Sequence, residues 1–415
     1  MNIKLNDMFE FALHNTLFKN KGVLQVKYTP DSIPHRDNQI KSIASILASV
    51  LRFERPSNLF IYGKTGTGKT LSVIYVCDQI AIKARELDLE LEFIYLNCKL
   101  RKVADTEHRV LSVLIKQIGE PLVKNGKMDK KFLLTDGLST ERLWGKFVDL
   151  VNIKKQLVVF IFDEVDQVVK KMDDNFLYSF TRINQELSKA QISLIGISNE
   201  VTFLENIDPR IRSSLGEEEF IFHPYNAIQL QDILNERCSK AFKKGVISDG
   251  VIAKCAAYAA REHGDARRAL DLLRIAGELS ERDGKKKINE EYIDLANSKM
   301  EKDKILDIIE GEPKQFKLVL AAVLDLTRKQ KDSKLEKFYT GDVFNLYQDF
   351  CDKTKTDILT QRRISDIIAE MDMLGIINAK LISKGRHGRT REIRLAVPEN
   401  LFNQIDKILN DSLGL

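Results

Sequence analysis

The chain has 415 residues, of which 43% are hydrophobic and 30% are charged, and its formal net charge is +5. This length predicts two or three domains, and the chain has no apolar stretch of about 18 residues, so we expect a cytoplasmic protein without a membrane partner. The five cysteines and six histidines form no cluster at metal-ligand spacing, which argues against a zinc site or a disulfide framework.

Short apolar runs rich in β-branched and aromatic residues alternate with helical patterns over the first half of the chain. They lie at residues 59–62, 91–96, 157–162, 193–197 and 219–222. A helical pattern over residues 71–89 follows the first run, and a helix between two strands is the crossover that a parallel pair requires. We therefore predict an α/β domain over residues 1–225, built on a mostly parallel sheet.

A glycine-rich loop that fits the pattern G-x-x-x-x-G-K-[ST] follows the first run directly. Glycines let the backbone turn tightly and aim N–H groups at phosphates, while the lysine reaches the β and γ phosphates and the threonine hydroxyl ligates Mg²⁺. A chance glycine-rich turn is the alternative. We predict a site for ATP or ADP with Mg²⁺, formed by Gly63, Lys64, Thr65, Gly66, Thr67, Gly68, Lys69, Thr70 and Leu71.

Two acids, Asp163 and Glu164, end the buried-strand pattern at residues 157–162. Ligands of α/β sheets bind at the carboxyl ends of the strands, so both carboxylates should lie beside the phosphate loop. We predict that Asp163 holds Mg²⁺ and that Glu164 orients or deprotonates the attacking water. The alternative is a strand that merely ends in solvated acids.

Three polar residues further along the chain are candidates for the same site. Asn199 follows the run at 193–197 and could bind the γ-phosphate or the attacking water, although asparagine is also common in turns after strands. Arg210 could act on the ATP of a neighbouring subunit or form a structural salt bridge with equal ease. Arg267, near the start of a predicted helix, could reach the γ-phosphate or simply pair with Asp271.

The strand pattern stops near residue 225, and two further domains are predicted beyond it. Residues 226–300 consist of helical patterns broken by glycine-containing turns, which indicates a small all-helical domain. Residues 301–415 consist of helical patterns followed by two short strands, which is the order of a winged helix-turn-helix.

The last domain carries the residues expected to contact DNA. A helical pattern with an apolar stripe begins near Arg362 and Arg363 and is typical of a recognition helix, although it could also be a plain packing helix. Residues 380–394 hold six bases and one acid, an imbalance that favours contact with phosphates. The residues assigned to DNA are Arg362, Arg363, Lys384, Arg386, His387, Arg389 and Arg391.

In order and spacing, these motifs resemble an AAA+ ATPase, and the whole chain resembles the archaeal origin-recognition and helicase-loader family. Beyond the general ATPase motifs, the resemblance rests on residues 34–40 (PHRDNQI), 95–98 (YLNC), 137–140 (GLST), 195–199 (IGISN) and 208–210 (DPR). The resemblance implies a AAA+ domain, a helical lid and a C-terminal winged helix.

The resemblance also implies roles for single residues. His35 and Arg36 would lie beside the adenine, Asn199 would be sensor 1, Arg210 the arginine finger and Arg267 sensor 2. A helical insertion within residues 99–140 would touch DNA, and the basic hairpin would be a wing that enters the minor groove.

By this resemblance the leading hypothesis is a replication initiator that binds duplex origin DNA and helps recruit or load the replicative helicase, with slow ATP hydrolysis as its switch. Other initiator subunits are further expected partners. The main alternative is a regulator that binds origins or promoters without loading a helicase. A processive motor or clamp-loader subunit is the third hypothesis, which would require fast turnover and ring assembly.

Overall fold

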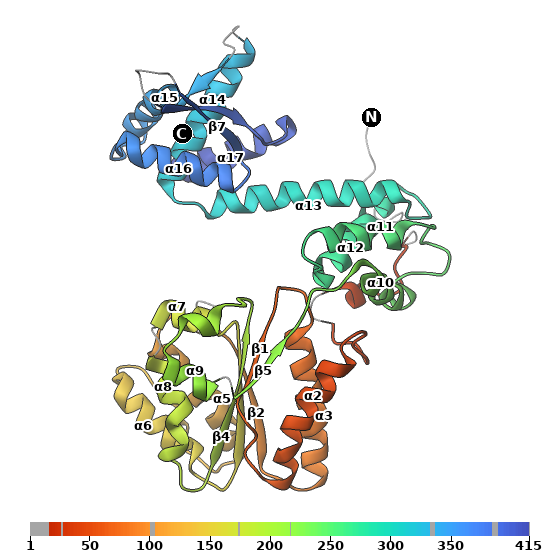
Figure 1. The fold of residues 1–415 in the computed structure, drawn as a ribbon, viewed down its shortest axis with the longest axis vertical. Coiled ribbons are helices and arrows are strands. Elements are labelled where there is room, and N and C mark those ends of the chain that lie inside the picture. Colours follow the sequence, from red (N-terminus) through yellow and green to blue (C-terminus); the bar gives the residue numbers. More distant parts are fainter. Residues whose placement is uncertain are drawn as a thin grey trace. The chain divides into compact units, whose positions relative to one another are not determined.

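The fold is taken from a computed structural model that describes residues 16–25, 28–99, 104–172, 175–215, 217–332, 337–383 and 389–414. The chain forms two compact units, residues 1–293 and residues 294–415 (Figure 1). Among the described helices, none has both the length and the apolar character needed to cross a membrane.

A five-stranded sheet forms the centre of the first unit. Its strands are β1 (Leu59–Tyr62), β2 (Leu91–Asn97), β3 (Leu157–Asp163), β4 (Gln191–Ser198) and β5 (Glu218–Ile221). The order across the sheet is β2-β3-β4-β1-β5, and every neighbouring pair is parallel. The predicted α/β fold is confirmed, and each of the five predicted runs is a strand whose ends differ by at most two residues from the prediction.

Helices cover both faces of this sheet (Figure 1). On one face, α2 (Asp37–Leu47) and α3 (Lys69–Glu86) pack on Ile61, Ile161 and Ile195. The other face is covered by α5 (Glu107–Lys124), α6 (Thr140–Val151), α7 (Asp166–Met172), α8 (Asn175–Arg182) and α9 (Pro209–Leu215). Successive strand residues point to opposite faces, so a strand covered on both sides is apolar along its covered length, as β3 is over residues 157–162.

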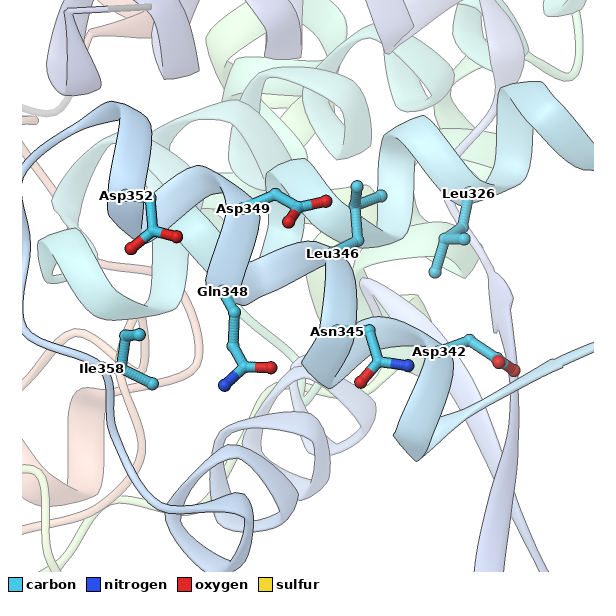
Figure 2. Close-up of a pocket in the computed structure, with 8 residues that line it drawn as sticks. All are labelled: Leu326, Asp342, Asn345, Leu346, Gln348, Asp349, Asp352 and Ile358. Atoms are coloured by element: carbon cyan, nitrogen blue, oxygen red, sulfur yellow. The ribbon is translucent and has the colours of Figure 1, made fainter.

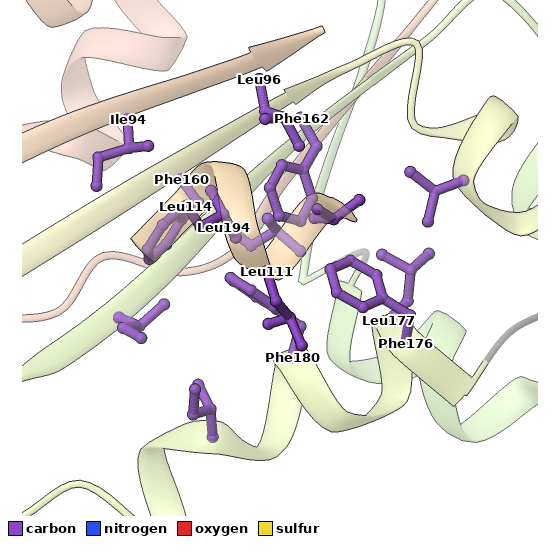
Figure 3. Packing of buried hydrophobic residues seen from close by; sticks show 14 of the residues in the cluster. Ile94, Leu96, Leu111, Leu114, Phe160, Phe162, Phe176, Leu177, Phe180 and Leu194 are labelled. Atoms are coloured by element: carbon purple, nitrogen blue, oxygen red, sulfur yellow. The ribbon is translucent and has the colours of Figure 1, made fainter. Parts of the chain in front are cut away.

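Aromatic rings fill the larger of the two cores (Figure 3). The Phe180 ring packs edge-on against Phe160, with the ring centroids 5.0 Å apart, and lies at the same distance from Phe162. Trp144 packs at the border of this core, and its indole N–H donates to Glu107. This packing fixes β3 and therefore the position of the two acids at its end.

A helical region follows the sheet in the first unit. Its helices are α10 (Ala227–Ala241), α11 (Val251–Arg261) and α12 (Ala266–Arg282). The first starts with a capping box between Asn226 and Gln229, directly after the border predicted at residue 225. The border predicted at residue 300 falls inside the long helix α13 (Glu290–Gly311).

The second unit is a winged helix with its own hydrophobic core. Its elements are α14 (Lys314–Asp332), β6 (Phe338–Tyr339), α15 (Thr340–Lys353), α16 (Gln361–Met373), β7 (Ile377–Ser383), β8 (Arg389–Leu395) and α17 (Phe402–Leu413). The three strands form an antiparallel sheet in the order β6-β8-β7. The predicted recognition helix is α16, and the predicted hairpin is the pair β7–β8.

Candidate functional site

The loop between β1 and α3 adopts a left-handed backbone, which favours glycine, at two of its turns. Gly66 has φ of 69° and Gly68 has φ of 87°. A Cβ atom on Gly66 would lie 1.7 Å from a carboxylate oxygen of Asp265, and one on Gly68 would lie 2.9 Å from the Tyr225 hydroxyl. The first clash could be relieved only by moving the lid, because Asp265 caps the start of α12.

Lys69 is the first residue of α3, and its side chain folds back over the loop. The ammonium donates to the carbonyl oxygens of Gly63 (2.7 Å) and Lys64 (2.8 Å) and to the side-chain oxygen of Asn199 (2.9 Å). Burial lowers the pKa of Lys69 to about 8, although the Asp163 carboxylate acts in the opposite direction. A cation surrounded by oxygen acceptors in this way is suited to exchange them for phosphate oxygens.

The end of β3 brings three oxygen-bearing side chains together. The hydroxyls of Thr70 and Tyr95 both donate to the same carboxylate oxygen of Asp163, at 2.9 Å and 2.7 Å. The Glu164 N–H donates to the other oxygen at 3.0 Å. Carboxylate and hydroxyl oxygens are ligands that Mg²⁺ accepts in proteins, so the predicted pair of Thr70 and Asp163 fits a magnesium site.

Tyr95 contacts Asp163 but is not among the site residues predicted from the sequence. It lies on β2, which pairs in register with β3, and this register brings its hydroxyl to Asp163. Burial, together with the Asp163 charge, raises the pKa of Tyr95, which keeps its hydroxyl a proton donor. Strand order cannot be read from a single sequence. The one local signal for Tyr95 is its position two residues before the end of a strand.

Glu164 stands beside this group in an uncommon backbone conformation. Its φ is 55°, in the left-handed region that side chains other than glycine seldom adopt. The carboxylate is mostly shielded from solvent and lies 3.6 Å from the Lys99 ammonium. Strained residues of this kind cluster at functional sites, because the surrounding structure must stabilise them.

The start of α12 rests directly on the loop. The Ala266 N–H donates to the Gly66 carbonyl at 3.2 Å, and Lys64 contacts the His263 ring at 3.2 Å. Asp265 caps the helix by accepting from the backbone N–H of Arg267. The positive charge of Arg267 contributes to the lowered pKa of Lys69, so the two cations lie within electrostatic range.

His35 and Arg36 belong to the same region but use their polar atoms on protein partners. His35 Nε2 lies 2.9 Å from an Asp232 carboxylate oxygen on α10. Arg36 is buried and donates to the carbonyl oxygens of Thr67 (2.9 Å) and His223 (2.6 Å). Its guanidinium also lies 4.0 Å from the centroid of the Tyr225 ring. Arg36 therefore braces the loop against the segment that follows β5.

Arg210 forms the salt bridge that the sequence left open as an alternative. Its guanidinium donates to both carboxylate oxygens of Asp208, at 3.1 Å and 2.9 Å, and lies 5.6 Å from the Tyr178 ring centroid. These bonds hold the pKa of Asp208 down at about 2. The Arg210 side chain is 70% exposed and remains accessible to solvent.

The second unit presents a basic hollow between α16 and the β7–β8 hairpin. Arg362, Ser365 and Arg391 line it together with Leu381, which is 57% exposed. Arg391 donates to the Ser365 carbonyl at 2.5 Å, which ties the hairpin to the helix. Arg363 lies on the exposed start of α16, with its guanidinium 3.9 Å from Asp366.

The acid within the basic hairpin is not a free surface charge. Glu392 is buried and accepts from Lys337 at 3.2 Å and from Arg394 at 3.1 Å, and these contacts lower its pKa. The acid thus faces two bases and offers little repulsion to a polyanion. Lys384, Arg386 and His387 lie outside the described residues, as does the side chain of Arg389.

Three family models match the chain in series. They are a AAA domain over residues 52–204, the Cdc6 AAA+ ATPase-type lid domain over residues 231–298, and the CDC6 C-terminal winged helix domain over residues 307–404. The order of the matches agrees with the order of sheet, helices and winged helix in the structure.

Curated relatives extend this similarity over almost the whole chain. The ORC1-type DNA replication protein of Pyrococcus furiosus is 46% identical over 396 residues, which are 95% of this chain and 91% of that protein. The ORC1-type DNA replication protein 1 of Methanosarcina mazei is 44% identical over 395 residues, with the same two shares.

Solved structures show the same similarity. The Aeropyrum pernix ORC1 protein, solved in complex with DNA, is 37% identical and superposes with a TM-score of 0.78 over 95% of this chain and 97% of that one. The Pyrobaculum aerophilum Cdc6p structure, at 20% identity and a TM-score of 0.57, covers 96% of this chain and all of that one, and it supports the fold alone.

Proposed function

The chain belongs to the family of ORC1-type DNA replication proteins, and we propose that it is a replication initiator that binds duplex origin DNA under the control of ATP and helps recruit or load the replicative helicase. The observation that carries this proposal is the presence in one chain of a phosphate loop contacted by a helical lid and a winged helix with a basic hollow. A nucleotide that changes the contact between the loop and the lid can control the affinity of the protein for DNA.

We propose that the loop at residues 63–71 binds the phosphates of ATP or ADP, with Lys69 on the β and γ phosphates. The contacts of Lys69 with three oxygen acceptors support this, because phosphate oxygens can replace them. Thr70 and Asp163 would hold Mg²⁺, which neutralises phosphate charge when it is bound. His35 and Arg36 would border the adenine.

Hydrolysis is proposed to depend on residues around the γ-phosphate. Glu164 would orient or deprotonate the attacking water, Asn199 would hold the γ-phosphate or that water, and Arg267 would sense the phosphate from the lid. Arg210 is proposed to complete the charge stabilisation at the site of a neighbouring subunit. Turnover by the isolated protein should then be slow.

A Glu164→Gln variant tests the hydrolysis site. The amide has the size of the carboxylate but cannot accept the proton of the attacking water, so ATP binding should persist while hydrolysis falls by roughly 100-fold or more. Filter binding with labelled ATP and single-turnover hydrolysis measure the two effects separately. Lys69→Ala is the matched control, because it should abolish binding itself. Equal hydrolysis by wild type and the glutamine variant would refute the role of Glu164.

DNA binding is proposed to use α16 and the hairpin, with Arg362, Arg363, Lys384, Arg386, His387, Arg389 and Arg391 as contacts. The one-sided charge of the hairpin supports this, because Glu392 is already held by Lys337 and Arg394. A relative solved in complex with DNA is 37% identical to this chain and matches 95% of its length, so the match extends into the second unit.

Origin recognition is tested by comparing duplexes that contain the repeats of the organism's own origin with random duplexes of equal length at matched salt. We expect a preference of at least roughly 100-fold for the origin, which must depend on bound nucleotide. Equal affinity for both duplexes would overturn the proposal. A pull-down of the replicative helicase on origin DNA then separates a loader from a regulator, since a regulator binds the origin but retains no helicase.

A further inference from the structure

The winged helix carries a groove that the DNA-binding hollow does not include. It has a volume of about 620 Å³ and is bordered by α14, α15 and the segment before α16. Figure 2 shows its side chains, which come from all three segments. Asp342, Asp349 and Asp352 supply carboxylates, and Leu326, Leu346 and Ile358 supply apolar surface.

The acidic and apolar side chains share one face of α15. Residues 342, 346, 349 and 352 follow each other at spacings of three or four, so they lie along a single stripe of the helix. This stripe spans roughly 15 Å, which is about three helical turns. Ile358 extends the apolar surface beyond the helix and is 45% exposed.

No ion pair holds the three carboxylates that line the groove within the described part of the chain. Within the described part of the chain, Asp349 and Asp352 form no ion pair, and Asp342 accepts only from the Tyr339 N–H. By contrast, Asp406 is paired with Arg328, and Glu392 with Lys337 and Arg394. The three carboxylates give the groove a formal local charge of −3, and the described residues that line it include no lysine or arginine.

We propose that this groove docks a basic amphipathic segment of a partner protein. Lysine or arginine side chains of the segment face the three carboxylates, while its apolar side chains contact Leu326, Leu346 and Ile358. A nucleic acid is the wrong occupant, because its phosphates are repelled by the carboxylates. The basic hollow and the acidic groove thus give one small domain two surfaces of opposite charge.

A synthetic peptide tests the groove on the full-length protein. The probe is a fluorescent helix-forming peptide of leucine and lysine, with the leucines on one face at helical spacing, and its control is a peptide of the same composition in scrambled order. We expect the amphipathic peptide to bind at least tenfold more tightly than the scrambled one at low salt. Affinities equal within twofold would overturn the proposal.

Two protein variants with the same change in net charge locate the binding. Asp349→Lys with Asp352→Lys reverses charge in the groove, and Asp307→Lys with Asp411→Lys reverses two exposed acids elsewhere in the unit. The groove variant should bind the peptide at least tenfold more weakly, and the control variant within about twofold of wild type, because rim charges act mainly on nearby partners. Equal weakening by both variants would mean that only net charge matters and would overturn the proposal.

A duplex-DNA titration of the same two variants separates the protein partner from a nucleic acid. If the groove faces protein, both variants bind random duplex with equal affinity, because they carry equal charge. A selective change of at least tenfold in DNA affinity for the groove variant would assign the groove to DNA and overturn the proposal. Neither outcome depends on whether the protein hydrolyses ATP or recognises an origin.

Discussion

The ammonium of Lys69 connects the loop to the turn after β4 and also lies near a charge of the lid. It bonds to two loop carbonyls and to Asn199, and it lies within electrostatic range of Arg267. Its burial has an energetic cost, because a cation without an opposite charge in contact is poorly solvated. A bound anion would remove that cost, which makes the site sensitive to the charge of its ligand.

This lowered pKa predicts that nucleotide affinity depends on pH. Lys69 has a pKa of about 8 in the free protein, and phosphate charge must raise it on binding, so the bound state takes up a proton at higher pH. Affinity should therefore be constant below the free pKa and fall as pH rises above it, by about tenfold between about pH 7 and pH 9. Titration with a fluorescent ADP analogue at a series of pH values measures this affinity.

The control for this prediction is Lys69→Arg. A guanidinium remains charged over this range, so the variant should bind more weakly but with a flat pH profile. Circular dichroism at the highest pH confirms that the fold is intact. A flat profile for wild type would show that Lys69 is fully charged in the free protein.

Tyr95 is predicted to position the carboxylate of Asp163. Tyr95→Phe removes the 2.7 Å hydrogen bond but keeps the ring, and groups that orient a metal ligand typically change metal affinity by about tenfold or more. We expect the Mg²⁺ concentration for half-maximal hydrolysis to rise by about tenfold, while binding of ADP without Mg²⁺ stays within twofold of wild type. If the magnesium dependence is unchanged, Tyr95 has no part in holding Asp163.

At the scale of elements, the hairpin β7–β8 and the helix α16 form one surface. Arg391 connects them through the Ser365 carbonyl, and the buried Glu392 is held by two bases. A hairpin anchored in this way can present its tip to DNA without losing its register on the sheet. The start of α12 is likewise held in place by a contact with another element, because its capping residue Asp265 lies against Gly66.

The tip of the hairpin is predicted to contribute phosphate contacts. Arg386→Ala with Arg389→Ala should weaken binding to duplex DNA and reduce the slope of log affinity against log salt by about 1.8, since each phosphate contact contributes about 0.9. Lys285→Ala with Lys286→Ala removes the same charge from exposed positions of the first unit and should leave the slope unchanged. Equal slopes for all three proteins would remove the hairpin tip from the interface.

At the scale of the whole molecule, the chain consists of two units with separate cores. The second core includes Ile309, which is fully buried although it lies on α13, the helix that contains the border between the units. Leu295, on the same helix, is 53% exposed. Two cores that share no buried residue should unfold as two cooperative systems.

Ile309→Ala is predicted to destabilise only the second unit. Removing a buried isoleucine side chain costs about 2–5 kcal/mol, and the loss should appear in the unfolding of residues 294–415 while nucleotide binding persists. Urea unfolding followed through DNA binding and nucleotide binding separates the two transitions. Leu295→Ala is the matched control and should change either free energy by about 0.5 kcal/mol or less. A single transition that shifts for both probes would show that the units unfold together.

Much of the fold was predictable from the sequence, because its signals are local. Buried strands of a parallel sheet are apolar throughout, and their runs at residues 59–62 and 157–162 stand out between helical patterns. The phosphate loop is a contiguous motif, and the two acids follow a strand directly. The order of sheet, helical domain and winged helix also follows from local patterns, and the family resemblance then added expected roles for single residues.

Contacts between segments distant in the sequence could not be predicted without the tertiary structure. The pairing of β2 with β3 brings Tyr95 to Asp163, the lid brings Asp265 to Gly66, and the acidic stripe of α15 becomes a groove only beside α14 and Ile358. A single sequence fixes which side chains share a helix face or end a strand, but not which other element packs against them. For this protein the sequence by itself determined the chemistry of the phosphate loop, and only tertiary packing decided which side chains surround it.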